Sequence, residues 1–136
     1  MSRQQTLDLI RRYYAAFNAG DGQGMLDCLA EHVAHDINQG GRHDGKDAFR
    51  AFLGHMARCY RERLDDVVVM ASEDGARAAA EFVVHGEYLA TDEGLPEAHG
   101  QKYILPAGAF FDVVDGRIAR VSVYYNLADW TAQVSA

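Results

Sequence analysis

The chain has 136 residues and so fits one domain with a single hydrophobic core. Hydrophobic residues make up 49% and charged residues 24%, as in an ordinary globular protein, and no apolar run approaches the ~20 residues that cross a bilayer, so we expect no membrane contact. A net charge of −7 without a basic stripe argues against a nucleic-acid partner, because phosphate contacts need a positive field.

The N-terminal region predicts two helices. Its first residues, MSRQQTLDLI, lack the apolar core and cleavage site of a signal peptide, so we expect a cytoplasmic protein. Apolar residues recur at helical spacing from Leu7 to Phe17, with Tyr14 on that face and Tyr13 on its flank. A Gly-Asp-Gly sequence ends this helix, and a second helix is expected over residues 23–30.

A short strand, a loop and a third helix come next. Residues 33–38 alternate in polarity, with His35 on one face and Asp36 on the other, which predicts a strand. The run GGRHDG has the composition of a loop. Apolar residues then recur at helical spacing from Phe49 to Tyr60, so we expect a helix there.

The second half of the chain predicts strands. Four segments are rich in valine, aromatic residues and alternation, and the turns EDGA and VDGR contain the Asp-Gly pair that is typical of hairpins. The segment TDEGLPEAHG, residues 91–100, is too long for a tight turn, and either a flap or a partner contact fits it. The expected strands span residues 66–72, 76–90, 101–114 and 117–127, and a short helix over residues 128–134 carries Trp130.

This order of elements defines the fold class. Helices followed by a run of antiparallel strands, with no repeat or linker, predict one α+β domain over residues 1–136. The economical arrangement is one curved, mostly antiparallel sheet wrapped around the N-terminal helices. Such a sheet leaves a cone, and the mouth of a cone is a natural site for a small molecule.

Three stretches of sequence carry a resemblance to a known family: RYYAAFNAGD at residues 12–21, VAHD at 33–36 and FFDVVDGRIARV at 110–121. Together with the order of elements along nearly the whole chain, they resemble the nuclear-transport-factor-2-like (NTF2-like) superfamily. Within it, the chain is most similar to ketosteroid isomerase and to the SnoaL-like, or polyketide cyclase-like, proteins. The resemblance implies an NTF2-like cone and a homodimer that pairs through the outer face of the sheet.

The resemblance to ketosteroid isomerase implies two catalytic groups. An arginine and a tyrosine on that family's first helix match Arg12 and Tyr13, so Tyr13, rather than Tyr14, takes the place of the oxyanion donor. Asp36 matches the general base if one residue is missing from the preceding turn, and His35 is then its outward neighbour.

One catalytic group of that family has no match. Ketosteroid isomerase adds a second, protonated acid that donates to the oxyanion, and in this chain Gly108 or Phe110 takes its place. Asp112 lies on the same strand face but two to four residues away, or roughly 7–13 Å along a strand, which is too far to substitute. The incomplete oxyanion hole argues against steroid isomerisation.

Other interpretations of these residues stay open. Strand alternation alone would turn Asp36 to water, and Tyr13 would then be an aromatic ring at the edge of the core. Either Tyr125, or Tyr124 together with Asn126, points into the cone. The residues that we expect to contact the substrate are Phe17, Phe52, Met56, Tyr88, Tyr103, Gly108, Phe110, Tyr125, Asn126 and Trp130.

No pattern predicts a metal or cofactor site. Two His-Asp pairs, at residues 35–36 and 43–44, lack a familiar ligand spacing, and the other histidines are scattered. Cys28 and Cys59 lie far apart on apolar helix faces, as reduced core residues do. The run GDGQG lacks the preceding strand and the spacing of a phosphate loop. We therefore expect no metal and no cofactor.

The leading hypothesis is a ketosteroid isomerase-like enzyme that moves a proton, without a cofactor, on a small apolar carbonyl compound in the cone. Asp36 would shuttle the proton, since partial burial raises the pKa of a carboxyl group, and Tyr13 would polarise the carbonyl. The alternatives are a SnoaL-like cyclase or hydrolase and a non-catalytic binding module. Polar groups near Tyr103, Tyr125 and Asn126 would favour the cyclase, and a uniformly apolar cavity would favour the binding module.

Overall fold

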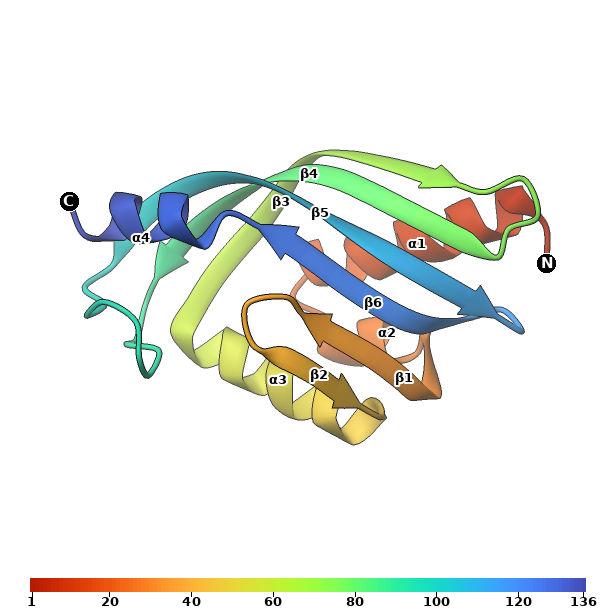
Figure 1. The fold of residues 1–136 in the computed structure, drawn as a ribbon, viewed down its shortest axis with the longest axis horizontal. Coiled ribbons are helices and arrows are strands. Elements are labelled where there is room, and N and C mark those ends of the chain that lie inside the picture. Colours follow the sequence, from red (N-terminus) through yellow and green to blue (C-terminus); the bar gives the residue numbers. More distant parts are fainter.

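One six-stranded sheet organises the computed structural model, which describes residues 1–136 (Figure 1). The strands lie in the order β2-β1-β6-β5-β4-β3, and every neighbouring pair is antiparallel except β1 and β6, which run parallel. The helices are α1 (Arg3–Asn18), α2 (Gly22–Leu26), α3 (Lys46–Cys59) and α4 (Leu127–Val134). The strands are β1 (Leu29–Ile37), β2 (Gly41–Asp44), β3 (Tyr60–Ala71), β4 (Arg77–Tyr88), β5 (Gln101–Val114) and β6 (Arg117–Tyr125).

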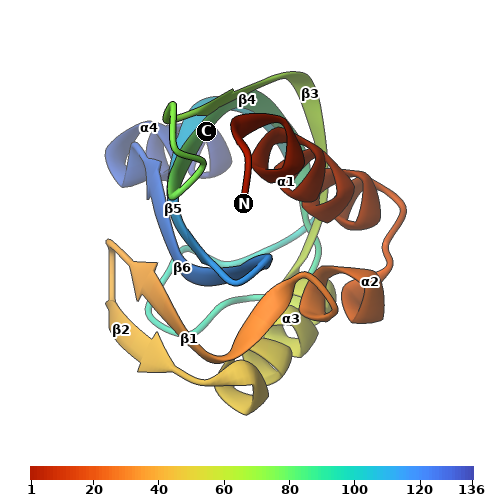
Figure 2. The same ribbon diagram turned by 90° about the vertical axis from the view of Figure 1, so that its right-hand side faces the viewer.

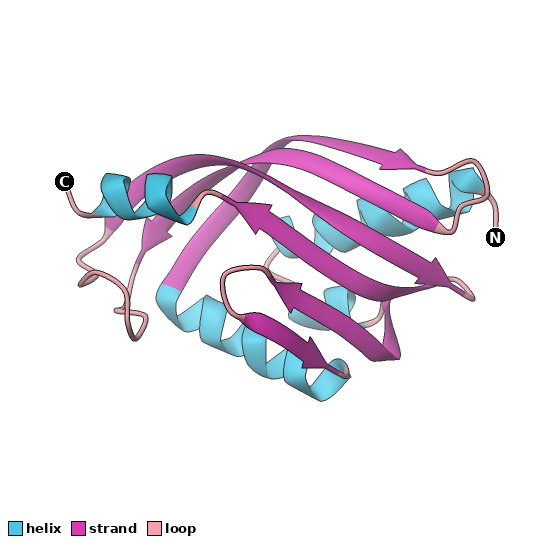
Figure 3. Cartoon of the chain, viewed as in Figure 1, coloured by secondary structure: helices cyan, strands magenta, loops and turns pink.

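The sheet bends strongly and has a concave and a convex face. Seen end-on, it curls from β3 through β6 to β2, and α1, α2 and α3 lie on its inner side (Figure 2). The long strands β3, β4 and β5 bend along their length (Figure 3). A bulge between Asp65 and Val68 adds to this bend, and Asp66 there adopts a φ of 55°. The predicted α+β class, with a curved and mostly antiparallel sheet, is confirmed.

Helix α1 is fixed at both ends. At its start the Ser2 hydroxyl accepts a hydrogen bond from the Gln5 backbone N–H, and the Gln5 side chain accepts one from the Ser2 N–H, which forms a capping box. At its end the Asn18 side chain donates to the Leu64 carbonyl at 2.9 Å and accepts from the Leu64 N–H at 2.8 Å. These contacts tie α1 to β3 and hold Tyr13 over the concave face of the sheet.

Two segments differ from the prediction. The run GGRHDG contains β2, which pairs with the end of β1 and is therefore not a simple loop. Strand β3 begins at Tyr60 rather than at residue 66, because the charged residues before that point alternate in direction. Arg61 and Arg63 are exposed, whereas Glu62 between them points inward. The remaining predicted elements are present, with α2 shorter than expected and β1 starting earlier, at Leu29.

Candidate functional site

A cavity of about 430 Å³ lies between the concave face of the sheet and helices α1, α3 and α4. Its wall is mostly apolar, since 20 of the 26 residues that line it are hydrophobic, as is typical of small-molecule sites. Tyr125 faces this cavity, whereas Tyr124 is exposed on the other face of the sheet. Of the residues predicted to act on or contact a substrate, the wall contains Tyr13, Phe17, Phe52, Met56, Tyr125 and Trp130.

The other predicted contact residues lie elsewhere. Tyr88 and Tyr103 are buried but do not line the cavity. Phe110 is 48% exposed, and Gly108 shares its outward direction because the two residues are separated by one position on β5. Asn126 is exposed and caps α4 with its side chain. The expectation that these five residues form the cavity wall was therefore wrong.

Asp36 also lies outside the cavity, on the convex face of the sheet. Its carboxylate is 2.6 Å from Arg42 Nε and 3.6 Å from Arg120 Nη1. These arginines, above all the hydrogen bond from Arg42, lower the pKa of Asp36. The ion pairs continue as a row of alternating charges across five strands, in the order Arg42, Asp36, Arg120, Asp112 and Arg77.

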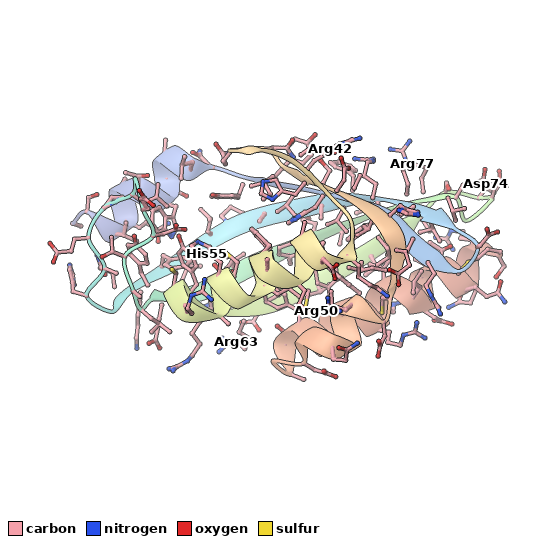
Figure 4. All side chains as sticks on the ribbon, turned by 90° about the horizontal axis from the view of Figure 1, so that it is seen from below. Arg42, Arg50, His55, Arg63, Asp74 and Arg77 are labelled. Atoms are coloured by element: carbon pink, nitrogen blue, oxygen red, sulfur yellow. The ribbon has the colours of Figure 1, made fainter.

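Figure 4 shows Arg42 and Arg77, the two ends of this charged row, along the same side of the molecule. The predicted position of Asp36 as a general base is wrong, because the alternation of β1 turns Asp36 outward and His35 inward. The side chain that β1 presents to the cavity is a buried imidazole rather than a carboxylate.

His35 sits between two phenylalanine rings of α3. Its ring centroid lies 4.6 Å from that of Phe49 and 4.6 Å from that of Phe52. Burial, with His43 nearby, lowers its pKa to about 4, so the imidazole is neutral at neutral pH. Its Nδ1 is buried and has no hydrogen-bond partner in the protein. The neutral ring can donate a hydrogen bond to a ligand or accept one from it without bringing a charge into the cavity.

Tyr13 is buried on α1 and lines the same cavity. Its ring packs edge-on against Tyr14 at 5.1 Å and against Phe111 at 5.9 Å. Burial raises its pKa, so the hydroxyl stays protonated and can act as a hydrogen-bond donor. Tyr14 packs against Phe82 in the core and touches the cavity as well.

A half-buried acid reaches the cavity from β3. Glu62, Gly86 and Tyr103 stand side by side on β3, β4 and β5. A side chain on Gly86 would overlap the Tyr103 ring, so the glycine leaves room for this ring to cross β4. The Tyr103 hydroxyl thereby donates to Glu62 Oε2 at 2.5 Å. Burial raises the pKa of Glu62, and this hydrogen bond opposes the rise only in part.

A second polar cluster surrounds Asp92, in the loop after β4. The Tyr60 hydroxyl donates to Asp92 Oδ2 at 2.7 Å, and His55 Nε2 lies 3.0 Å from Asp92 Oδ1. His55 projects from α3 near its C-terminal end (Figure 4). Trp130 covers this region from α4, with its ring centroid 6.1 Å from that of Tyr60. Tyr60, His55, Asp92 and Trp130 all line the cavity.

Four polar residues of these two clusters were not predicted as site residues, namely Glu62, His55, Tyr60 and Asp92, whereas Tyr103 was. The alternation of Tyr60, Glu62 and Leu64 with Arg61 and Arg63 was the signal that could have placed Glu62 inside. No comparable signal exists for Asp92, because a loop has no repeating pattern that orients its side chains.

The comparisons agree with this architecture. An NTF2-like protein from Burkholderia pseudomallei K96243 is 20% identical, with a TM-score of 0.77 over 97% of this chain and 98% of that chain. At this low sequence identity the similarity shows the fold alone, and it confirms the NTF2-like cone. The SnoaL-like domain family matches residues 10–121, and the chain belongs to this family.

Two solved structures are similar over nearly their full length. A candidate polyketide cyclase from Pseudomonas putida KT2440 is 63% identical, with a TM-score of 0.94 over 95% of this chain and 97% of that chain. A candidate polyketide cyclase from Silicibacter sp. TM1040 is 58% identical, with a TM-score of 0.96 over 100% and 99% of the two chains. The comparison with curated proteins found no match. None of the four helices combines the length and apolarity that crossing a bilayer requires.

Proposed function

We propose that this SnoaL-like protein is an acid–base enzyme that acts on a small, largely apolar carbonyl compound of the polyketide type, with Glu62 moving the proton. The observation that carries the proposal is the Glu62 carboxyl group, which meets an apolar cavity and is held at one oxygen by Tyr103. The two relatives described as candidate polyketide cyclases support the substrate class.

The environment of Glu62 suits this role. Because burial raises its pKa, the carboxyl group can accept a proton from a carbon acid and release it again closer to neutral pH than an exposed glutamate. Tyr103 binds Oε2 and leaves Oε1 for the substrate. The raised pKa of Tyr103, caused first by its own burial and then by the charge of Glu62, keeps this donor protonated.

In the proposed reaction, Oε1 takes a proton from a carbon between two carbonyl groups. The resulting enolate attacks another carbonyl carbon of the same molecule, a carbon–carbon bond forms, and the alkoxide takes the proton from Glu62. Ring closure is then an isomerisation, in which no atom enters or leaves. The Tyr13 hydroxyl, which has no partner in the protein, would donate to the enolate oxygen.

The same groups accommodate the chemistry that the ketosteroid isomerase resemblance implies. If Glu62 returned the proton to another carbon, the product would carry a shifted double bond. The base is then Glu62 rather than Asp36, whereas the proposed role of Tyr13 is unchanged.

The test uses deuterium exchange at the acidic carbon of β-keto esters and 1,3-diketones in D2O, followed by NMR. Glu62→Gln should slow the protein-catalysed exchange by about 10²- to 10⁴-fold, the usual contribution of a general base. The rate of the wild type should fall on acidification with a midpoint above the ordinary glutamate pKa of 4.5, because the raised pKa delays ionisation, and Glu62→Gln should lack this dependence.

Asp36→Asn is the matched control, since it also replaces a carboxylate by an amide, but on the convex face and outside the cavity. Its exchange rate should stay within a few-fold of the wild type. Equal rates for Glu62→Gln and the wild type, or no exchange above buffer with any of these probes, would refute the proposal.

We also propose that two copies pair through the convex face of the sheet. Ile104, Phe110 and Tyr124 are 57%, 48% and 50% exposed on neighbouring strands of this face, which is unusual for side chains of their size. The cavity lies on the concave side of the sheet, so pairing of the convex faces would not cover its lining residues.

A further inference from the structure

Three side chains with metal-binding atoms meet beside the cavity, where α3 passes into β3. His55 and Cys59 are four residues apart on α3 and therefore lie on the same face of that helix. Asp92 approaches them from the loop after β4. One nitrogen of His55, Sγ of Cys59 and a carboxylate oxygen of Asp92 all lie within 4.8 Å of one another.

We propose that His55, Cys59 and Asp92 bind a divalent transition metal, with Zn²⁺ as the best match, and leave one coordination position open. Imidazole, thiolate and carboxylate are the ligand types that Zn²⁺ takes in proteins, and three protein ligands with an open fourth position are typical of sites that bind an external ligand. His55 and Asp92 line the cavity, so the open position faces it and would take an oxygen ligand.

The surrounding hydrogen bonds hold the ligands in place. The Cys59 carbonyl accepts from the backbone N–H groups of Leu89 at 2.7 Å and Ala90 at 3.3 Å, which ties the end of α3 to the start of the loop that carries Asp92. The Tyr60 hydroxyl occupies Asp92 Oδ2 and leaves Oδ1 for the metal. Such partners orient metal ligands, and their removal costs about 10- to 100-fold in affinity.

Metal binding requires only small changes in the distances between the three ligand atoms. With bond lengths of about 2.0–2.3 Å, neighbouring ligand atoms around a tetrahedral Zn²⁺ lie about 3.3–3.8 Å apart. His55 Nε2 and Asp92 Oδ1 are 3.0 Å apart and would separate slightly, whereas Cys59 Sγ, which lies within 4.8 Å of both, would move closer to them. Binding replaces the thiol proton of Cys59 by the metal, so affinity should rise with pH.

The experiment titrates the full chain, freed of metal by chelation and kept reduced, with Co²⁺. Because cobalt bound to a thiolate has a charge-transfer band in the near ultraviolet, we expect such a band to saturate at one Co²⁺ per chain and to disappear when Zn²⁺ is added. Cys59→Ser should abolish the band, whereas Cys28→Ser, which changes the other buried cysteine, should retain it.

Three further variants keep the outcome decisive if Cys59→Ser does not fold. His55→Ala and Asp92→Asn should weaken Co²⁺ binding at least tenfold, and Tyr60→Phe should weaken it about tenfold while the band persists. Absence of the band in the folded wild type, or an equal band in folded Cys59→Ser, would overturn the site. The test needs no turnover and none of its variants alters Glu62, so its result is separate from that of the proposed function.

Discussion

The state of His35 follows from what surrounds its ring. Two phenylalanine rings and the cavity replace water around the imidazole, which lowers its pKa to about 4. A buried polar atom without a partner, such as its Nδ1, costs about 1–3 kcal/mol. Because this cost is recovered when a ligand supplies the missing hydrogen bond, His35 favours ligands with a polar group at this point of the cavity.

The buried imidazole predicts how stability depends on pH. Between pH 6.5 and about 4 the unfolded chain holds the His35 proton and the folded chain does not, so the free energy of unfolding decreases as the pH falls through this window. His35 alone should contribute a loss of up to about 3 kcal/mol. Urea unfolding at several pH values should show a shallower dependence for His35→Leu than for the wild type. Exposed His99→Leu is the control, and parallel curves for His35→Leu and the wild type would contradict the prediction.

At the scale of elements, the three neighbouring strands β3, β4 and β5 position the hydrogen bond between Tyr103 and Glu62. Neighbouring strands lie about 4.8 Å apart, so Glu62 on β3 and Tyr103 on β5 are separated by roughly 10 Å of backbone. Only a side chain that lies across β4 can bridge that distance, and it can do so because Gly86 has no side chain. The geometry of the proposed acid–base pair therefore depends on a residue that carries no functional group.

Replacement of this glycine should disturb the pair without removing either member. We expect Gly86→Ala to push the Tyr103 ring away from Glu62, lower the exchange rate at least tenfold and cost about 1–3 kcal/mol of stability by overpacking. Combined with Tyr103→Phe it should slow exchange little further, because both changes break one hydrogen bond. Gly54→Ala, on an exposed position of α3, is the control and should leave exchange unchanged. Full exchange activity in Gly86→Ala would show that the reaction does not require the Tyr103 hydroxyl beside Glu62.

The elements were largely predictable from the sequence, and the side-chain directions were less so. Alternation in β5 is regular, and its predicted limits, residues 101 and 114, match the structure. In β3 the charged residues concealed the same pattern, and Glu62 was missed with it. Asp36 was misplaced because the family resemblance outweighed the alternation of β1, which by itself indicates the outward direction. The Asp92 cluster joins a helix, a strand and a loop, so only the tertiary fold reveals it.

For the molecule as a whole, the two faces of the sheet have different chemistry. The concave face encloses an apolar cavity with Glu62, Asp92 and His35 at its wall. The convex face combines the charged row from Arg42 to Arg77 with large exposed apolar side chains. Large exposed aromatic side chains are enriched where protein chains meet, and a few such residues supply most of the binding energy of a contact.

This division predicts a homodimer with Phe110 at its interface. Sedimentation equilibrium should give twice the monomer mass for the wild type. Phe110→Arg should weaken the dimer at least 30-fold, because loss of a central aromatic contact costs about 2 kcal/mol or more. Leu89→Arg changes a side chain that is 38% exposed at the end of β4, and it should not affect the mass. Since Phe110 lies on the face opposite the cavity, the Phe110→Arg variant should bind Co²⁺ like the wild type. If the wild type is a monomer at about 100 μM, a stable pairing of convex faces is ruled out.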